Sequence, residues 1–215
     1  MQRVLTLSVL VLLLVGNGYC DSDVQAGLLG QDLLTASLLA LNEDGLESQD
    51  INDPFDMEGF GPDKWYFEAY GSGAIEFSGG NDAYSGHAGV GFFFHEQFSF
   101  SIIGAAGYMS VPSNDDSQYV GFDLLPRWHF AKWDQLRLFV EVGAGLHYAF
   151  PERFPENGSH FNFRSHAGMG VLYQLTEQVY LLGGANYLHI SNANLVSPNV
   201  GWDGIEGYFG VVMPF

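Results

Sequence analysis

The sequence predicts an all-β protein, an eight-stranded antiparallel β-barrel that spans a membrane. From Lys64 onward, segments of about 10–16 residues rich in aromatic residues, β-branched residues and glycine alternate with turn residues. Within these segments apolar and polar residues alternate, which is the period of a β-strand with two different faces. The gaps between segments are alternately short and long, as are the periplasmic turns and external loops of outer-membrane barrels.

Eight strands are expected from this pattern. They lie at residues 64–78, 83–95, 97–111, 118–132, 135–149, 160–175, 178–191 and 205–215. The tight gaps follow the second, fourth and sixth of them. Because an even number of strands returns the chain to its starting side, both ends of the barrel should be periplasmic and odd-numbered strands should run outward.

The two faces of the middle strands favour a membrane barrel over a soluble β-sandwich. In 135–149, apolar residues from Leu136 to Tyr148 share one face, and Arg137, Glu141 and His147 share the other. A sandwich would turn its charged face to water, but here the polar faces are rich in glycine, as suits the narrow lumen of an eight-stranded barrel. The long apolar faces carry aromatic residues near their ends, as lipid-facing surfaces do. The closing alternation that ends in Phe215 resembles the assembly signal of bacterial outer-membrane proteins.

The charge of the chain is strongly negative and unevenly distributed. Seven Lys and Arg against 25 Asp and Glu give a formal charge of −18, which argues against a nucleic-acid partner, since such binding needs a basic face. Residues 21–63 hold 11 of the acidic residues and no Lys or Arg. A segment of one charge sign with little apolar material is typical of disorder, so 21–63 is expected to be an acidic, flexible extension before a barrel at 64–215.

The first 20 residues have the plan of a secretory signal peptide. Arg3 precedes an apolar run from Val4 to Val15, which is too short for a transmembrane helix of about 20 residues. Cleavage after Cys20 is the main expectation, and a lipoprotein cut before Cys20 is the alternative. Cys20 is the single cysteine, so no intramolecular disulfide and no catalytic thiol are expected.

A candidate catalytic pair lies at the end of the seventh expected strand. His189 and Ser191 are two residues apart, so on a strand they point to the same face with Cβ atoms about 6–7 Å apart. An imidazole beside a hydroxyl group is the base and nucleophile of a serine hydrolase. If this face meets lipid, the pair meets a membrane substrate; if it faces the lumen, the pair is packed away and inert.

The residues around this pair resemble a known family. The run from His189 to Asn194, then Pro198-Asn199 and Gly204-Ile205-Glu206 before a final strand, is similar to the PagL family of lipid A 3-O-deacylases. The close similarity covers about the last forty residues. It implies an eight-stranded barrel of the bacterial outer membrane and hydrolysis of the 3-O-linked acyl ester of lipid A, with lipopolysaccharide as the substrate and no metal or cofactor.

The resemblance also implies roles for individual residues. Ser191 would be the nucleophile, His189 its general base, and Glu206 the acid that orients the imidazole. Asn192, through its side chain, and the backbone N–H of Asn194 would stabilise the oxyanion.

The acid is the assignment that the strand pattern does not support. If Phe215 faces lipid, Ile205 does too and Glu206 falls inward, unless a bulge or the preceding loop re-aims it. Asp203 is the alternative acid.

Other readings of the chain stay open. The barrel is either this esterase, a non-catalytic structural or adhesive barrel, or a phospholipase or acyltransferase that uses the same pair; a monomer and a homodimer are both compatible with the sequence. Several charged residues share the expected lumen faces, where a paired network is the ordinary filling, and no zinc-ligand spacing is present. These residues are Asp123, Arg127, His129, Arg137, Glu141, His147, Arg164 and His166.

Overall fold

The computed structural model describes residues 60–78, 80–110, 116–155 and 157–215. The predicted signal peptide, and the predicted acidic extension up to residue 59, lie outside the described residues. No helix among the described residues is long and apolar enough to cross a membrane.

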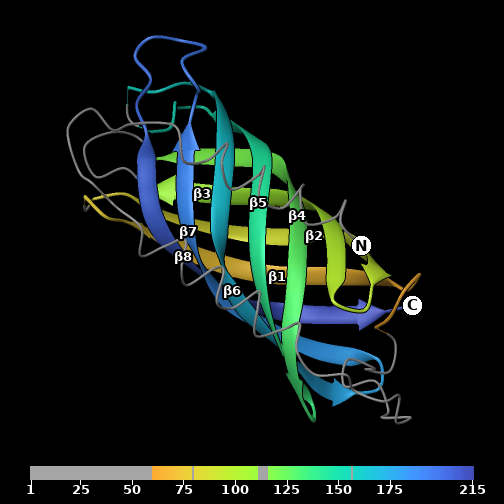
Figure 1. Cartoon of the computed structure of the whole chain (residues 1–215). Coiled ribbons are helices and arrows are strands. Elements are labelled where there is room, and N and C mark those ends of the chain that lie inside the picture. Colours follow the sequence, from red (N-terminus) through yellow and green to blue (C-terminus); the bar gives the residue numbers. More distant parts are fainter. Residues whose placement is uncertain (1–59, 79, 111–115, 156) are drawn as a thin grey trace, which may run out of the picture. The chain divides into compact units, whose positions relative to one another are not determined.

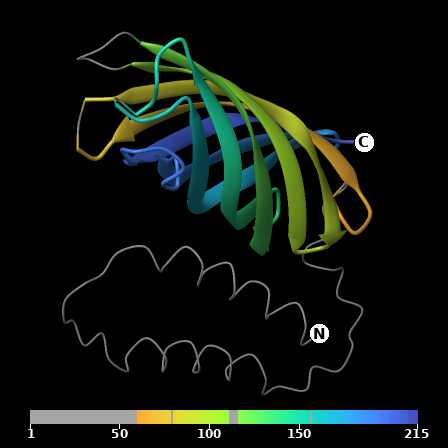
Figure 2. The same ribbon diagram turned by 90° about the horizontal axis from the view of Figure 1, so that it is seen from above.

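The described chain forms a closed barrel of eight antiparallel strands in sequence order (Figures 1 and 2). The strands are β1 (Trp65–Glu76), β2 (Asp82–His95), β3 (Phe98–Ser110), β4 (Ser117–Trp133), β5 (Leu136–Phe150), β6 (Phe161–Thr176), β7 (Val179–Ser191) and β8 (Trp202–Pro214). The β8 strand closes the barrel on β1, from the pair Tyr66–Pro214 to the pair Glu76–Gly204. Closure leaves no sheet edge, as hydrocarbon requires, because an unpaired backbone group there costs several kcal/mol.

The strand prediction is confirmed, with one displaced boundary. The first seven strands begin and end within two residues of their expected positions, but β8 begins at Trp202 rather than at residue 205. The extra residues pair with the end of β7, down to Ile190 opposite Trp202. The loop before β8 is therefore shorter than predicted, and Asp203 belongs to a strand.

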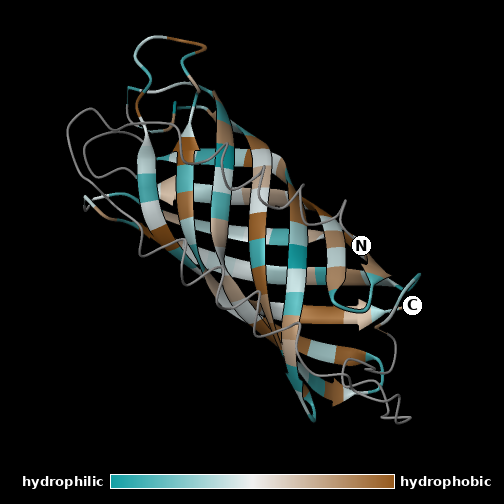
Figure 3. Cartoon of the chain, in the orientation of Figure 1, coloured by the Kyte–Doolittle hydropathy of each residue, from teal (hydrophilic) through white to brown (hydrophobic). Residues whose placement is uncertain are grey.

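Hydrophobic and hydrophilic residues alternate along the strands (Figure 3), and successive side chains are alternately exposed on the outer wall and buried in the lumen, as predicted. On β4, Val120, Phe122 and Leu124 are exposed on the outer surface, whereas Asp123 is fully buried inside. The outer wall as a whole carries many exposed large apolar side chains, including Trp65, Ile102, Trp128, Met169 and Phe209.

Several of the predicted charged residues of the lumen form ion pairs. Arg127 bridges Glu68 at 2.7 Å and Glu141 at 2.8 Å. Arg164 contacts Asp123 at 2.8 Å. Its other terminal nitrogen contacts the Glu206 carboxylate on β8 at 2.6 Å. All of these side chains are almost completely buried, so removing one partner would leave an uncompensated charge, typically at a cost of about 3–5 kcal/mol.

Apolar clusters pack inside the barrel on either side of this charged layer. Towards the end where both termini of the barrel lie, Phe60 packs edge-on against Tyr180 with ring centroids 4.4 Å apart and against Phe93 at 5.2 Å. Towards the opposite end, Phe154 packs against Trp202 at 5.9 Å. Among the described residues, packing inside the barrel thus includes Phe60, four residues before the expected barrel boundary at Lys64.

Candidate active site

The end of β7 presents His189 and Ser191 on the outer face of the barrel. Asn186 marks the lumen face, because its side chain donates a hydrogen bond to Glu141 at 3.0 Å. Residues an odd number of positions away therefore face outward, and Tyr187 on that outer face is half exposed. His189 and Ser191 share this face, at the end of the strand farthest from the termini of the barrel. Both side chains therefore point towards lipid and not into the lumen.

The imidazole of His189 lies between a hydroxyl group and a carboxylate. Its Nε2 is 3.1 Å from Oγ of Ser191, and its Nδ1 is 2.8 Å from Oδ1 of Asp203. Asp203 stands directly opposite His189 in the β7–β8 pairing, where facing side chains are in contact range. The three groups form a hydroxyl–imidazole–carboxylate chain within hydrogen-bonding distance.

Glu206, the acid expected from the resemblance, lies on the other side of the wall. It is buried, pairs with Arg164 at 2.6 Å and accepts a hydrogen bond from Ser72 at 2.8 Å. The β7–β8 register is continuous, so no bulge turns Glu206 outward. Asp203, and not Glu206, is therefore the carboxylate beside His189, because three residues along a strand reverse the direction of the side chain.

This arrangement has one proton assignment that suits hydrolysis. A carboxylate at Asp203 accepts the Nδ1–H of His189, which leaves Nε2 unprotonated and able to accept the hydroxyl proton of Ser191. That tautomer is the one a general base for a serine nucleophile requires. The side chains of His189 and Asp203 are 38% and 44% exposed, so the site opens to the surroundings of the barrel rather than to its interior.

The loop after Ser191 begins with a tight turn. Leu195 donates its backbone N–H to the carbonyl of Asn192 at 3.0 Å, and Ala193 and Asn194 between them both have positive φ. Positive φ at both central positions defines a type I′ turn. The exposed Asn194 therefore lies at the corner of this turn, three residues after Ser191.

Asn192 stabilises this loop through hydrogen bonds of its side chain and its backbone. Its side-chain nitrogen donates to the carbonyls of Val196 at 3.0 Å and Pro198 at 3.2 Å, and the side chain is buried. Its backbone N–H donates to Oδ1 of Asn199 at 3.1 Å. The expected oxyanion contact from the Asn192 side chain is not available in this arrangement, and Asn199 is brought to the peptide that follows Ser191.

The sequence resemblance includes Asn199 but implies no role for it. No residue spacing identifies such a contact, because it depends on how the loop folds back on itself. Gly201 in the same loop lies against the His189 ring: a Cβ there would be 3.3 Å from Cε1. Glycine lets the chain pass this close to the imidazole.

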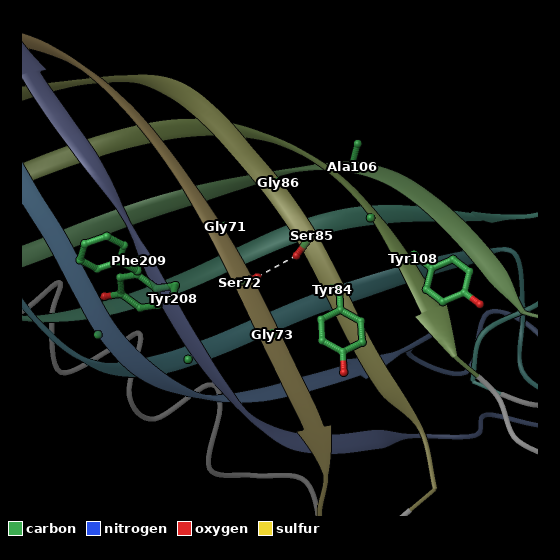
Figure 4. Close-up of a pocket in the computed structure, with 13 residues that line it drawn as sticks. Gly71, Ser72, Gly73, Tyr84, Ser85, Gly86, Ala106, Tyr108, Tyr208 and Phe209 are labelled. Atoms are coloured by element: carbon green, nitrogen blue, oxygen red, sulfur yellow. Dashed lines mark hydrogen bonds between the residues drawn. The ribbon is translucent and has the colours of Figure 1, made fainter.

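The outer wall next to β8 is hollowed by small residues. A shallow depression of about 740 Å³ lies over β1, β2 and β3, with Gly71, Gly73 and Gly86 in its floor and Tyr84 and Phe209 beside it (Figure 4). Strand pairing connects it towards the face of β7 that carries His189 and Ser191, since Gly73 pairs with Gly207 and Gly207 pairs with Ala185.

Comparison with known proteins gives one family. The sequence model of a family described as Lipid A 3-O-deacylase (PagL) matches residues 60–212. Comparison with curated proteins gives no match. Among the described residues, no group of three or more His, Cys, Asp or Glu side chains is placed to hold a metal ion.

Comparison with solved structures finds several that are similar to this chain. Neisserial surface protein A (NspA) is 16% identical, with a TM-score of 0.54 over 70% of this chain and 97% of that one. The outer membrane enzyme PagL is 21% identical, with a TM-score of 0.48 over 69% of this chain and 99% of that one. OprG from Pseudomonas aeruginosa is 11% identical, with a TM-score of 0.49 over 74% and 99%. The likeness to NspA concerns the fold alone, and the family rests on the match over residues 60–212.

Proposed function

Because the chain belongs to the lipid A 3-O-deacylase (PagL) family, we propose that it hydrolyses the ester of the 3-O-linked acyl chain of lipid A with the triad Ser191, His189 and Asp203. The protein is a β-barrel of the bacterial outer membrane. The observation that carries the proposal is the position of a hydrogen-bonded serine, histidine and aspartate on the lipid-facing wall. An acyl chain in the surrounding leaflet reaches such a site without leaving hydrocarbon.

In the first half of the reaction, Oγ of Ser191 attacks the ester carbonyl while its proton passes to Nε2 of His189. Asp203 stabilises the imidazolium through Nδ1. When the tetrahedral intermediate collapses, the bond to the sugar oxygen breaks and that oxygen takes the proton from Nε2. The 3-hydroxyacyl chain is then an ester of Ser191.

In the second half, water attacks this ester and gives its proton to Nε2. The intermediate releases a 3-hydroxy fatty acid and returns the proton to Oγ of Ser191. Base and acid are the same imidazole in both halves, so the arrangement needs one correctly held histidine.

The oxyanion donors are proposed from the loop. The backbone N–H of Asn194 remains the candidate that the resemblance suggested. Asn199 is a second, because its Oδ1 receives the N–H of Asn192 and its Nδ2 is the donor end of the same amide, next to the nucleophile. One such donor is typically worth about 10²–10³ in rate.

The test is mass spectrometry of lipid A from cells that express the full chain. Expression is expected to remove one 3-hydroxyacyl group, and a folded His189→Ala variant is expected to leave lipid A unchanged. Identical spectra with the native chain would instead support a non-catalytic barrel. Release of fatty acid from added phospholipid, with intact lipid A, would support a phospholipase or acyltransferase that uses the same residues.

The depression in the outer wall provides a separate prediction about how the substrate lies. If an acyl chain crosses it, Gly207→Leu should lower deacylation of long-chain substrate at least fivefold by raising KM. The barrel should tolerate the change, because a Cβ at Gly207 would meet nothing within 4 Å. Ala144→Leu, on the outer face of β5, is the matched control and should leave KM unchanged. Equal KM values for both variants would place the acyl chain elsewhere on the wall.

A further inference from the structure

We propose that Tyr187 is a positioning residue of this site: its hydroxyl group holds the Asp203 carboxylate against His189, and Phe77 holds the Tyr187 ring in place. This inference rests on the proposed triad, and it adds a fourth side chain that nothing in the residue motif indicates.

The first observation is a shared carboxylate oxygen. The Tyr187 hydroxyl donates to Oδ1 of Asp203, the same oxygen that lies 2.8 Å from Nδ1 of His189. Tyr187 pairs with Ile205 across β7–β8, so it reaches Asp203 on the diagonal, a separation that aromatic side chains can span. Two donors therefore converge on one oxygen from neighbouring positions of the same strand face.

The second observation is the exposure of the carboxylate. The Asp203 side chain is 44% exposed on the outer face, so burial restrains its orientation less than it would in the lumen. A hydrogen bond to an ionised group is roughly twice as strong as one between neutral groups. The Tyr187 hydroxyl thus helps to hold Oδ1 beside Nδ1 of His189.

The third observation explains why the tyrosine itself stays in place. The Phe77 ring stacks on the Tyr187 ring, with centroids 5.9 Å apart and an angle of 22° between the planes. The backbone N–H of Phe77 also donates to the Asp203 carbonyl at 2.9 Å. Phe77 follows directly after β1, so three strands, β1, β7 and β8, contribute to the orientation of one carboxylate.

A membrane-interface role alone does not account for this geometry. Tyrosines in an interfacial belt place the ring among lipids and the hydroxyl group in the headgroup region. The Tyr187 hydroxyl is instead directed along the wall to a specific oxygen. Tyr187→Phe separates the two roles, because it keeps the ring and its stacking on Phe77 and removes only the donor.

The experiment uses the purified full chain in detergent and compares Tyr187→Phe with Tyr173→Phe, an exposed tyrosine on the outer face of β6. Tyr187→Phe is expected to lower kcat for lipid A about tenfold with KM changed less than twofold, equivalent to about 1.4 kcal/mol of transition-state stabilisation. Tyr173→Phe should match the native chain. Equal kcat values for native and Tyr187→Phe protein would overturn the positioning role.

A second readout distinguishes positioning from a general structural effect. The rate at which a fluorophosphonate labels Ser191 reports nucleophile activation for any substrate and can be followed for days, so slow variants remain measurable. Tyr187→Phe should slow labelling about tenfold in the native background and less than twofold in the Asp203→Asn background, where the carboxylate is already gone. The same loss in both backgrounds would contradict action through Asp203.

The two readouts also separate this inference from the proposed function. If the native chain deacylates lipid A but Tyr187→Phe does so equally well, only the positioning role fails. If lipid A is left intact but Ser191 is labelled, the lipid A proposal fails and the labelling rates still decide on Tyr187. If the native chain shows neither activity, no activated serine exists and both proposals fall.

Discussion

Ser191→Ala is expected to lower the rate of lipid A deacylation by about 10⁴–10⁶-fold while leaving the barrel folded. The hydroxyl group is the only part of the side chain that the change removes, and its one short contact at the site is the 3.1 Å hydrogen bond to His189. Losses of this size are typical when a serine nucleophile is removed from a working triad. The measurement is the release of 3-hydroxy fatty acid by purified protein, together with the loss of fluorophosphonate labelling.

The matched control for this variant is Ser165→Ala. Ser165 lies on β6 directly opposite His189 in the β6–β7 pairing, so it is a neighbouring hydroxyl group that the mechanism does not use. Its removal should change the rate less than twofold. Comparable losses in both variants, or a Ser191→Ala protein that keeps a tenth of the native rate, would refute the assignment of the nucleophile.

Asp203→Asn and Glu206→Gln are expected to have opposite effects on activity and stability. Asp203→Asn should lower kcat about 10³–10⁴-fold, because an amide no longer favours the His189 tautomer with Nδ1–H, and should leave stability nearly unchanged at this partly exposed position. Glu206→Gln should keep kcat within a few-fold. It should lower the free energy of unfolding by up to about 3–5 kcal/mol, since Arg164 loses a buried charge partner at 2.6 Å.

This pair of variants is measured by initial rates and by urea unfolding of the barrel in lipid vesicles. The outcome that contradicts the site is the reverse one: a folded Glu206→Gln protein without activity and an active Asp203→Asn protein. Ser72 also donates a hydrogen bond to Glu206, so Ser72→Ala is a further check. Like Glu206→Gln, it should lower the free energy of unfolding and leave kcat nearly unchanged.

The fold was predictable because each strand of a membrane barrel repeats the same two-residue contrast. The alternation from Leu136 to Tyr148 fixes which residues face lipid, and it placed Arg137, Glu141 and His147 in the lumen, where they lie. The outward face of His189 and Ser191 was not determined in this way, because both faces of β7 are apolar. It follows from the strand register, which pairs residues far apart in the sequence.

The acid of the site could be predicted only in part. Parity along the last strand, counted from Phe215, already placed Glu206 inward and left Asp203 as the alternative. The resemblance favoured Glu206 through the Gly204-Ile205-Glu206 motif, and a loop or a bulge was expected to turn it outward. The β8 strand instead begins at Trp202 and includes Glu206. The contacts of Asn199, Gly201 and Phe77 depend on loop conformation and on barrel closure, and a linear pattern contains no signal for either.

The lumen of this barrel is packed rather than open. Phe60 with Phe93 and Tyr180 fills one end, Phe154 with Trp202 fills the other, and ion pairs lie between them. Apolar rings and ion pairs among the described residues thus occupy the lumen, whereas the interior of a porin is polar and filled with water. The hydrogen-bonded Ser191, His189 and Asp203 lie on the other surface, the outer wall.

Because side chains on β7 and β8 alternate between two faces, selection for stability and selection for activity act on different residues of these strands. Tyr187, His189, Ser191 and Asp203 look outward, while Asn186, Leu188, Trp202 and Glu206 look inward. Natural substitutions at odd and even positions of these strands should therefore occur independently. Substitutions in the lumen should change the stability of the barrel, and substitutions on the outer face should change the catalytic rate. A lineage that lost its substrate could change the outward-facing residues of the site and keep the inward-facing ones. Its protein would still fold as a barrel but would have no enzymatic activity.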